Sequence, residues 1–266
     1  MNHPIMTQTR RVAADIDLLG AWMPVPGFGV LPVNAYVIHG REPVLVDTGL
    51  AALRQEFLAA LSEALDPSTL RWIWITHMDA DHVGNLQAVL DIAPNARVVT
   101  TYLGMGKMGL LGLPVERAWL LNPGQVLEAG TRRLEAVVPP SFDAPETTAI
   151  HDGSSGALFS ADCFGALMTG PVEDAAAIPA HALRDGMVSW ASVDAPWLSL
   201  VADSSMNAVL DRVRSLAPDI VLGSHLPPAR GITDTLLRHL DAARSAPRFE
   251  EPDQAALERM MAGQAA

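Results

Sequence analysis

Cysteine is nearly absent from this sequence of 266 residues, which contains only Cys163. A single cysteine excludes an intrachain disulfide framework and a cysteine-rich zinc module, because both need several thiols. Basic residues are also few: 18 Lys and Arg stand against 30 Asp and Glu, a formal net charge of −12. This balance argues against nucleic acid or an anionic membrane as the main partner, since little positive charge is available to neutralise phosphates.

A long apolar run is missing as well. The longest uncharged stretch, residues 18–40, is interrupted by three prolines and by glycines, so it predicts strands and turns rather than a membrane span. In residues 1–17 acids follow Arg10 and Arg11 almost at once, and no apolar segment separates charge from a cleavage site. We therefore expect neither a secretory nor a twin-arginine signal, and we expect a cytoplasmic protein.

Hydrophobic residues are plentiful, at 49% of the chain, which is enough for one sizeable core and excludes general disorder. Short Val- and Ile-rich runs predict strands, and apolar residues at helical spacing predict helices. No GxGxxG follows a predicted strand, so a dinucleotide site has no support. Strands are expected at 35–39, 43–47, 72–76, 96–101, 126–138 (two strands), 157–161 and 219–223, and helices at 52–65, 82–92, 196–216 and 233–246.

The order of these elements predicts the architecture. A strand-rich segment followed by strand–helix alternation occurs twice, which favours two sheets packed face to face with helices outside, an α/β protein in one domain over residues 1–266. Residues 1–11 are expected to form a loosely held arm. Residues 169–195 are expected to form a lid or insertion, and residues 247–266 a C-terminal helical tail capped by Asp253.

One short segment carries most of the chemical information. Residues 76–82 read THMDADH and place His77, Asp79, Asp81 and His82 between a predicted strand and a predicted helix. A loop that leaves a strand and enters a helix can turn these imidazoles and carboxylates toward one point. A lone histidine at a strand end is usually structural, but four potential ligands within six residues indicate a metal site.

The segment resembles the HxHxDH motif of the metallo-β-lactamase superfamily, with Asp79 at the second histidine position. An acid there is similar to the flavodiiron proteins and their oxygen-binding di-iron relatives, which read HxExDH. Residues 158–165, LFSADCFG, resemble that family's bridging-carboxylate strand and place the bridge at Asp162. Residues 221–225, VLGSH, resemble its last ligand segment and place a ligand at His225. This resemblance implies a four-layer αββα sandwich.

The chain departs from the family at one ligand position, because Asp143 stands where the family has histidine. The resemblance implies that one metal takes His77, Asp79, Asp143 and the bridging Asp162, and that Asp81, His82, Asp162 and His225 hold the other. An alternative is that Asp143 lies outside the ligand set. Asp47 is expected either to hydrogen-bond the metal loop or to cap a turn. Alternation along the strand directs Cys163 away from the metals, as a buried structural thiol.

The expected ligands are imidazoles and carboxylates without thiolate, which favours iron, with zinc or manganese as alternatives. The first functional hypothesis is a flavodiiron-like protein that binds or reduces O₂ or NO. The residues after His225 are too few for the flavodoxin-like FMN domain of that family, so we expect electrons from a separate partner. The second is a dinuclear hydrolase of an ester, thioester, lactone, lactam or phosphodiester. A third is a non-enzymatic protein with a decayed site. The family resemblance also suggests a homodimer.

Overall fold

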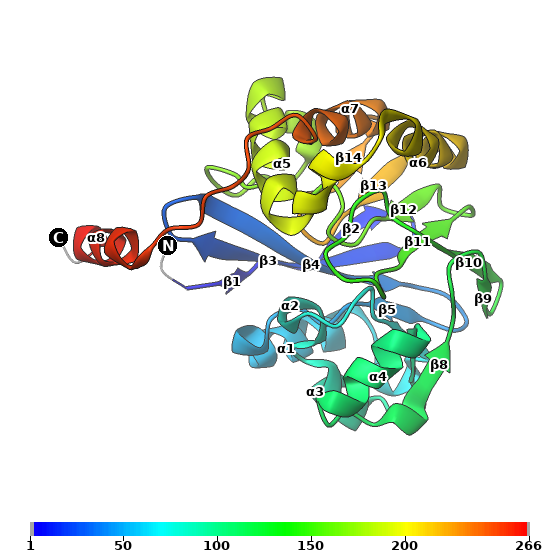
Figure 1. The fold of residues 1–266 in the computed structure, drawn as a ribbon. Coiled ribbons are helices and arrows are strands. Elements are labelled where there is room, and N and C mark those ends of the chain that lie inside the picture. The colour runs from blue at the N-terminus through cyan, green and yellow to red at the C-terminus, as the bar shows by residue number, and fades with distance from the viewer. Residues whose placement is uncertain (1–2, 265–266) are drawn as a thin grey trace.

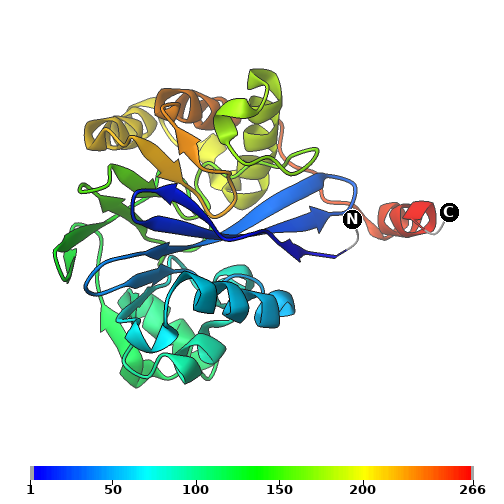
Figure 2. The same ribbon diagram turned by 180° about the vertical axis from the view of Figure 1, so that it is seen from behind.

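The computed structural model describes residues 3–264 as two β-sheets packed face to face, with helices on both outer faces (Figure 1). This arrangement confirms the four-layer α/β sandwich expected from the sequence. Seen from behind, the N-terminal strands run across the middle of the molecule between the two helical layers (Figure 2).

The first sheet has eight strands, in the order β1-β3-β4-β5-β6-β7-β8 with β2 paired to β3. Strands β5 to β8 are mutually parallel, so their carboxyl ends lie at one edge of the sheet. The bounds are β1 Ile5–Met6, β2 Arg10–Ala13, β3 Ile16–Val25, β4 Gly29–Ile38, β5 Val44–Val46, β6 Trp72–Trp74, β7 Arg97–Thr100 and β8 Ala118–Leu120.

The second sheet has six strands, in the order β14-β13-β12-β11-β10-β9. Strands β12 and β13 are parallel, so the segments that follow them leave from the same edge. The bounds are β9 Val126–Ala129, β10 Arg132–Val137, β11 Ala149–Asp152, β12 Ala157–Phe159, β13 Ile220–Leu222 and β14 Ala229–Arg230.

Helices α1 to α4 cover the first sheet, helices α5 to α7 cover the second, and α8 extends beyond the sandwich near the N-terminal strand (Figure 1). The α-helices are α1 Arg54–Ala64, α2 Ala80–Val83, α3 Leu86–Ile92, α4 Tyr102–Leu110, α5 Ala180–Asp194, α6 Asp203–Leu216, α7 Thr233–Ala243 and α8 Gln254–Gln264. Short 3₁₀ turns are η1 Ala51–Leu53, η2 Pro67–Thr69, η3 Val115–Arg117, η4 Ala175–Ala177 and η5 Pro196–Leu200. No helix in residues 3–264 is both long and apolar enough to cross a membrane.

Three apolar layers hold the sandwich together. Trp74, Tyr36 and Phe159 are buried between the two sheets, with Tyr36 and Phe159 in edge-to-face contact at 5.4 Å between ring centroids. Phe57 and Leu61 of α1 pack against the outer face of the first sheet. These layers fix the sheet edges from which the candidate site projects.

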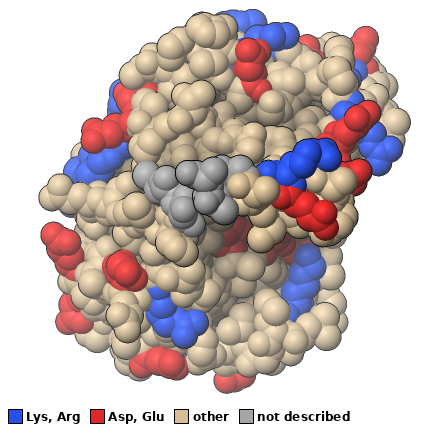
Figure 3. Space-filling model, turned by 90° about the vertical axis from the view of Figure 1, so that its left-hand side faces the viewer, with Lys and Arg blue, Asp and Glu red and all other residues tan. Residues whose placement is uncertain are grey.

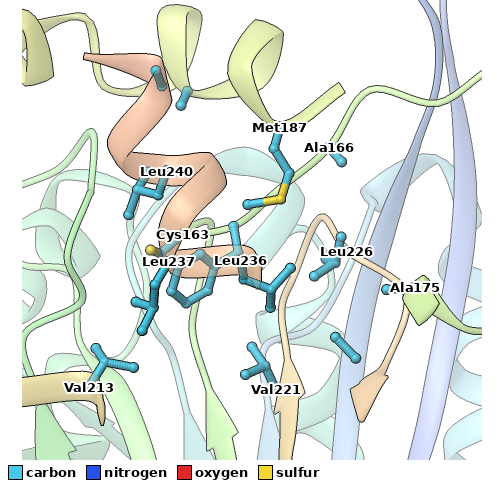
Figure 4. Close-up of a cluster of buried hydrophobic side chains, with 14 of the residues drawn as sticks. Cys163, Ala166, Ala175, Met187, Val213, Val221, Leu226, Leu236, Leu237 and Leu240 are labelled. Carbon is cyan, nitrogen blue, oxygen red and sulfur yellow. The ribbon is translucent and has the colours of Figure 1, made fainter. Parts of the chain in front are cut away.

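The third layer lies between the second sheet and helices α5 to α7. Figure 4 shows Cys163 within this cluster, close to side chains of α7 such as Leu236 and Leu237. Burial raises the pKa of the Cys163 thiol to about 12. The prediction of a buried structural thiol is therefore confirmed.

Several elements differ from the sequence expectation. The expected N-terminal arm contains β1 and β2, which both pair with β3 and extend the first sheet. The expected helix at 82–92 is divided at Gly84 and Asn85: Asn85 departs from helical dihedrals, and its side-chain amide donates to the Thr48 and Leu50 carbonyls at 2.7 and 3.0 Å. The expected insertion at 169–195 contains the regular helix α5, whose Leu183 and Met187 are buried. The cap at Asp253 is present, since its side chain accepts a hydrogen bond from the Ala256 amide at 2.8 Å.

Candidate metal centre

The loop after β6 carries the first group of candidate ligands. His77 and His82 are almost fully buried, with 0% and 1% exposure, whereas Asp81 is half-buried and Asp79 is exposed. The chain leaves the sheet at Thr76 and re-enters helical structure at α2, so both imidazoles turn inward. Their ring centroids are 3.9 Å apart.

Asp47 fixes the shape of this loop. It follows β5 with a positive φ of 58°, a conformation that Asp adopts more readily than most residues. Its Oδ1 accepts a hydrogen bond from the Thr76 amide at 2.8 Å, and its Oδ2 lies 2.9 Å from Nδ1 of His82. Of the two expected roles for Asp47, the structure shows the hydrogen bonds to the metal loop.

These contacts decide which imidazole nitrogens face the centre. The Thr76 hydroxyl donates to Asp47, so its oxygen can accept from Nδ1 of His77 at 3.1 Å. Nδ1 of His225 donates to the Pro32 carbonyl at 2.8 Å. His77, His82 and His225 thus all engage Nδ1 in the surrounding protein and direct Nε2 inward, the arrangement that orients histidine ligands in metal sites.

The second sheet contributes Asp162 and His225, which follow the parallel strands β12 and β13. The Asp162 turn has left-handed backbone at Ala161 and Phe164, with φ values of 53° and 72°. Its backbone carbonyl accepts a hydrogen bond from the Trp190 indole at 3.1 Å, and the Trp190 ring lies 4.7 Å from the His225 ring. The two ligand segments are therefore held by the same tryptophan of α5.

Asp143 lies on the loop between β10 and β11, which is attached at three points. Lys107 of α4 contacts Glu146 at 2.5 Å, and the Trp197 indole donates to the Phe142 carbonyl at 2.8 Å. The Thr148 amide donates to the Thr76 carbonyl at 2.9 Å, which joins this loop to the His77 loop. Asp143 is consequently held beside the cluster although it is exposed.

The structure brings all seven sequence-predicted ligands together around Asp162. Nε2 of His77 lies 3.6 Å from Asp162 Oδ2 and 3.9 Å from Asp143 Oδ1. Nε2 of His225 lies 3.2 Å from Asp81 Oδ2 and 3.3 Å from Asp162 Oδ1, and Nε2 of His82 lies 3.1 Å from the same Asp162 oxygen. The sets whose ligand atoms lie within 4.8 Å of one another are His77, His82 and Asp162; Asp81, His82 and His225; and His77, Asp79 and Asp143.

The charges of the cluster are unevenly distributed. Burial alone would lower the pKa of His82 and His225, but the negative charges of Asp162 and the neighbouring carboxylates outweigh burial. The pKa of His82 is therefore raised well above its usual value, and that of His225 is raised to about 10. Burial lowers the pKa of His77, and nearby His82 adds to this effect. Burial raises the pKa of Asp79 and Asp143, and like-charged neighbours add to it. The cluster therefore lacks positive charge on the side of Asp79 and Asp143.

The donor set fits a metal. Nε2 of His77, Nε2 of His82 and Oδ1 of Asp162 are buried and make no hydrogen bond of ordinary geometry to the described residues, although Nε2 of His82 and Oδ1 of Asp162 lie 3.1 Å apart. Leaving a buried polar group unpaired costs about 1–3 kcal/mol, so three converging atoms of this kind form a candidate site for a cation. A divalent ion held there would replace the protons of the metal-free imidazoles and offset the charge of the carboxylates.

Sequence reasoning missed Asp194, the last residue of α5. Its carboxylate, with those of Asp143 and Asp162, forms a fourth set of oxygens within 4.8 Å of one another. Burial raises the pKa of Asp194 to about 8, and the charges of Asp162 and Asp143 add to it. A signal was present: Met187, Ala191 and Asp194 recur at helical spacing, which places an acid on the buried face of a helix.

An apolar cavity of about 540 Å³ opens beside Asp81. In Figure 3 this side of the molecule is hollowed between its two halves, and acidic side chains are visible in the recess. Trp190 and Val193 of α5 form one wall, and Phe28 and Phe249 stack at 5.6 Å on another. The remaining lining residues are Met23, Val25, Leu31, Leu50, Ala51, Ala80 and Leu167.

Comparison with known sequences gives a family match over most of the chain. Residues 28–247 match the profile of the Metallo-beta-lactamase superfamily. A putative diflavin flavoprotein A 1 of Thermosynechococcus vestitus is 32% identical over 135 residues, which are 50% of this chain and 24% of that protein. A nitric oxide reductase of Moorella thermoacetica is 25% identical over 133 residues, 50% of this chain and 33% of that protein. The match thus spans about a quarter to a third of these relatives.

Comparison with solved structures supports the same fold. Rubredoxin oxygen:oxidoreductase from the anaerobe Desulfovibrio gigas superposes with a TM-score of 0.79 at 20% identity, covering 90% of this chain and 62% of that one. Fragment 1–254 of putative diflavin flavoprotein A 5 from Nostoc sp. PCC 7120 superposes with a TM-score of 0.75 at 16% identity, covering 91% and 97%. The second comparison extends over nearly all of the fragment.

Proposed function

Because the chain belongs to the metallo-β-lactamase superfamily, we propose that it is a flavodiiron-like oxidoreductase whose His/Asp cluster holds two metal ions and binds or reduces O₂ or NO. The fold comparisons with a rubredoxin oxygen:oxidoreductase and the sequence likeness to a nitric oxide reductase support this activity class.

One ion is assigned to His77, Asp79, Asp143 and Asp162, and the other to Asp81, His82, Asp162 and His225. The observation that carries this assignment is the convergence of two buried imidazoles on Asp162. Nε2 of His77 and Nε2 of His82 lie 3.6 Å and 3.1 Å from the Asp162 carboxylate and make no hydrogen bond of ordinary geometry to residues 3–264. Asp143 belongs to one set with His77 and Asp79, which favours a ligand role at the position where the family has histidine.

The ligand atoms favour iron. Imidazole nitrogen and carboxylate oxygen suit iron and manganese, and the set contains no thiolate, which would favour zinc. Five candidate carboxylates would be repelled by one another without cations, and two divalent ions largely offset their charge. When bound, an iron pair supplies electrons to a small diatomic ligand.

The protein residues around the cluster prepare it for that chemistry. Asp47 and the Pro32 carbonyl hold the imidazoles of His82 and His225 in fixed orientations. The apolar walls formed by Trp190 and Val193 favour an uncharged molecule over a charged one. O₂ and NO are both uncharged and small, so this recess suits them. We propose that reducing equivalents reach the site from a separate electron donor.

A dinuclear hydrolase is the second candidate, and the size of the cavity favours it. A volume of about 540 Å³ lies within the range of small-molecule sites and exceeds the need of a diatomic gas. The apolar walls match the acyl part of an ester, thioester or lactone better than a charged phosphodiester. For that reaction, metal ions held by the same His and Asp residues would supply the activation of a water molecule as nucleophile.

The experiment that separates these candidates compares two metal forms of the same protein. We expect the iron-loaded, reduced protein to change its visible absorption spectrum on addition of O₂ or NO. The zinc-loaded protein is the control and is assayed with aryl esters, thioesters and lactones. Turnover of these substrates with zinc, together with an unchanged iron spectrum, would contradict the oxidoreductase.

A further inference from the structure

Asp194 is held beside the candidate metal centre by the packing of α5. Leu183, Met187 and Ala191 of this helix are buried against the second sheet, so its inner face is fixed. The Leu167 amide donates to the Gly186 carbonyl at 3.2 Å, and the Trp190 indole donates to the Asp162 carbonyl at 3.1 Å. The last turn of α5 is thereby attached to the same segment that carries Asp162.

The position is unfavourable for a carboxylate unless a cation is present. Asp194 lies within reach of Asp143 and Asp162, and oxygens of the three residues lie within 4.8 Å of one another. A helix C-terminus also carries a partial negative charge, so the last residue of α5 gains nothing from the helix dipole.

A separate observation points to a ligand at this place. His77 is 0% exposed, and its Nε2 has no hydrogen-bond partner within the described part of the chain. This atom faces Asp162 at 3.6 Å and Asp143 at 3.9 Å, the same two residues that Asp194 adjoins. An unpaired buried imidazole and three carboxylates therefore approach one region from four different segments of the chain.

We propose that Asp194 is a further ligand of the metal ion held by His77, Asp143 and Asp162. The inference rests on the proposed metal site and is independent of the redox reaction. A carboxylate in addition to Asp143 makes this position oxygen-rich, which favours a hard cation such as iron or manganese over zinc. The helix from which Asp194 projects would thus be part of the metal centre.

The test uses Mn²⁺ as the probe, because free aqueous Mn²⁺ has a strong electron paramagnetic resonance signal that binding diminishes. Metal-free full-length protein is titrated as wild type, as Asp194→Asn and as Asp185→Asn. Asp185 is the matched control, since it lies on the same helix with 69% of its side chain exposed. We expect two bound ions for the wild type and for Asp185→Asn, and at least about tenfold weaker binding of one ion for Asp194→Asn.

Heat denaturation adds a readout that a purely structural role would not produce. Without metal, Asp194→Asn should melt at the same or a higher temperature than the wild type. An amide at this place needs neither an ionised carboxylate beside two other acids nor the uptake of a proton on folding. With Mn²⁺ its stabilisation should be smaller than that of the wild type. Two ions bound to Asp194→Asn with unchanged affinity would overturn the role of Asp194 alone, whereas a wild type that binds no ion would overturn the metal site itself.

Discussion

At the scale of single residues, the site depends as much on the groups that orient the candidate ligands as on the ligands. Asp47 contacts both the Thr76 amide and Nδ1 of His82, so one carboxylate sets the loop and one imidazole. The motif at residues 76–82 was readable from the sequence because its ligand types are close together. The role of Asp194 could not be predicted from the sequence, because Asp194 comes close to Asp143 only when α5 packs on the second sheet.

Replacement of Asp47 should weaken metal binding without removing a ligand. Asp47→Asn keeps the size of the side chain but removes the negative charge that favours the Nδ1–H tautomer of His82. We expect metal affinity to fall by about 10- to 100-fold. The measurement is a titration of the metal-free protein, with the exposed Asp91→Asn variant as control. Equal affinities for both variants would contradict the orienting role.

At the scale of elements, α5 was the least predictable from its sequence. Gly186 lowers helix propensity, and the prolines at 171 and 179 suggest irregular structure. The structure explains the glycine: a Cβ at Gly186 would lie 2.2 Å from the backbone oxygen of Leu167. The N-terminal strands β1 and β2 were also missed, because they are short and depend on pairing with the distant strand β3.

Two alanine substitutions at helical glycines should have opposite effects. Gly186→Ala should lower the free energy of unfolding by about 1–3 kcal/mol, because backbone atoms must move to accept the methyl group. Gly106→Ala in α4 should raise it by about 0.5–1 kcal/mol, since no described atom lies within 4 Å of its Cβ position and alanine favours helix. Urea denaturation measures both. A stabilising Gly186→Ala would contradict the close packing of α5.

At the scale of the whole molecule, the arrangement of the sheets could be predicted from the sequence more completely than the surroundings of the site. The repeated order of strands and helices indicated two sheets with outer helices, and the parallel strands then bring Asp47, His77, Asp162 and His225 to neighbouring edges. The apolar cavity beside Asp81 could not be predicted, because its walls come from β3, β4, α5 and the C-terminal segment. Such a surface exists only in the assembled sandwich.

The metal-free protein should lose stability as the pH rises from about 6.5 to 8.5. The pKa of His225 is raised to about 10 by Asp162 and Asp81, which overcome burial, so its contribution is complete below the unfolded pKa and is lost as the pH rises through the folded pKa. Asp194, with its pKa raised to about 8 by burial, changes stability in the same direction. We expect the free energy of unfolding to fall by at least about 1.4 kcal/mol, the equivalent of one pKa unit.

Urea denaturation in the presence of a chelator at pH 6.5, 7.5 and 8.5 measures this slope. Asp194→Asn should reduce the slope, because it removes one of the groups that bind protons more tightly in the folded state. A free energy of unfolding that is constant or rises over this range would contradict the charge distribution described for the cluster.

The decisive measurement is anomalous X-ray diffraction from crystals of the iron-loaded protein, recorded on both sides of the iron absorption edge. Two peaks are expected on either side of the Asp162 carboxylate, one beside His77 and Asp143 and the other beside Asp81 and His225. The absence of iron peaks at this cluster, or a single peak that leaves His77 and Asp143 without metal, would contradict a dinuclear centre.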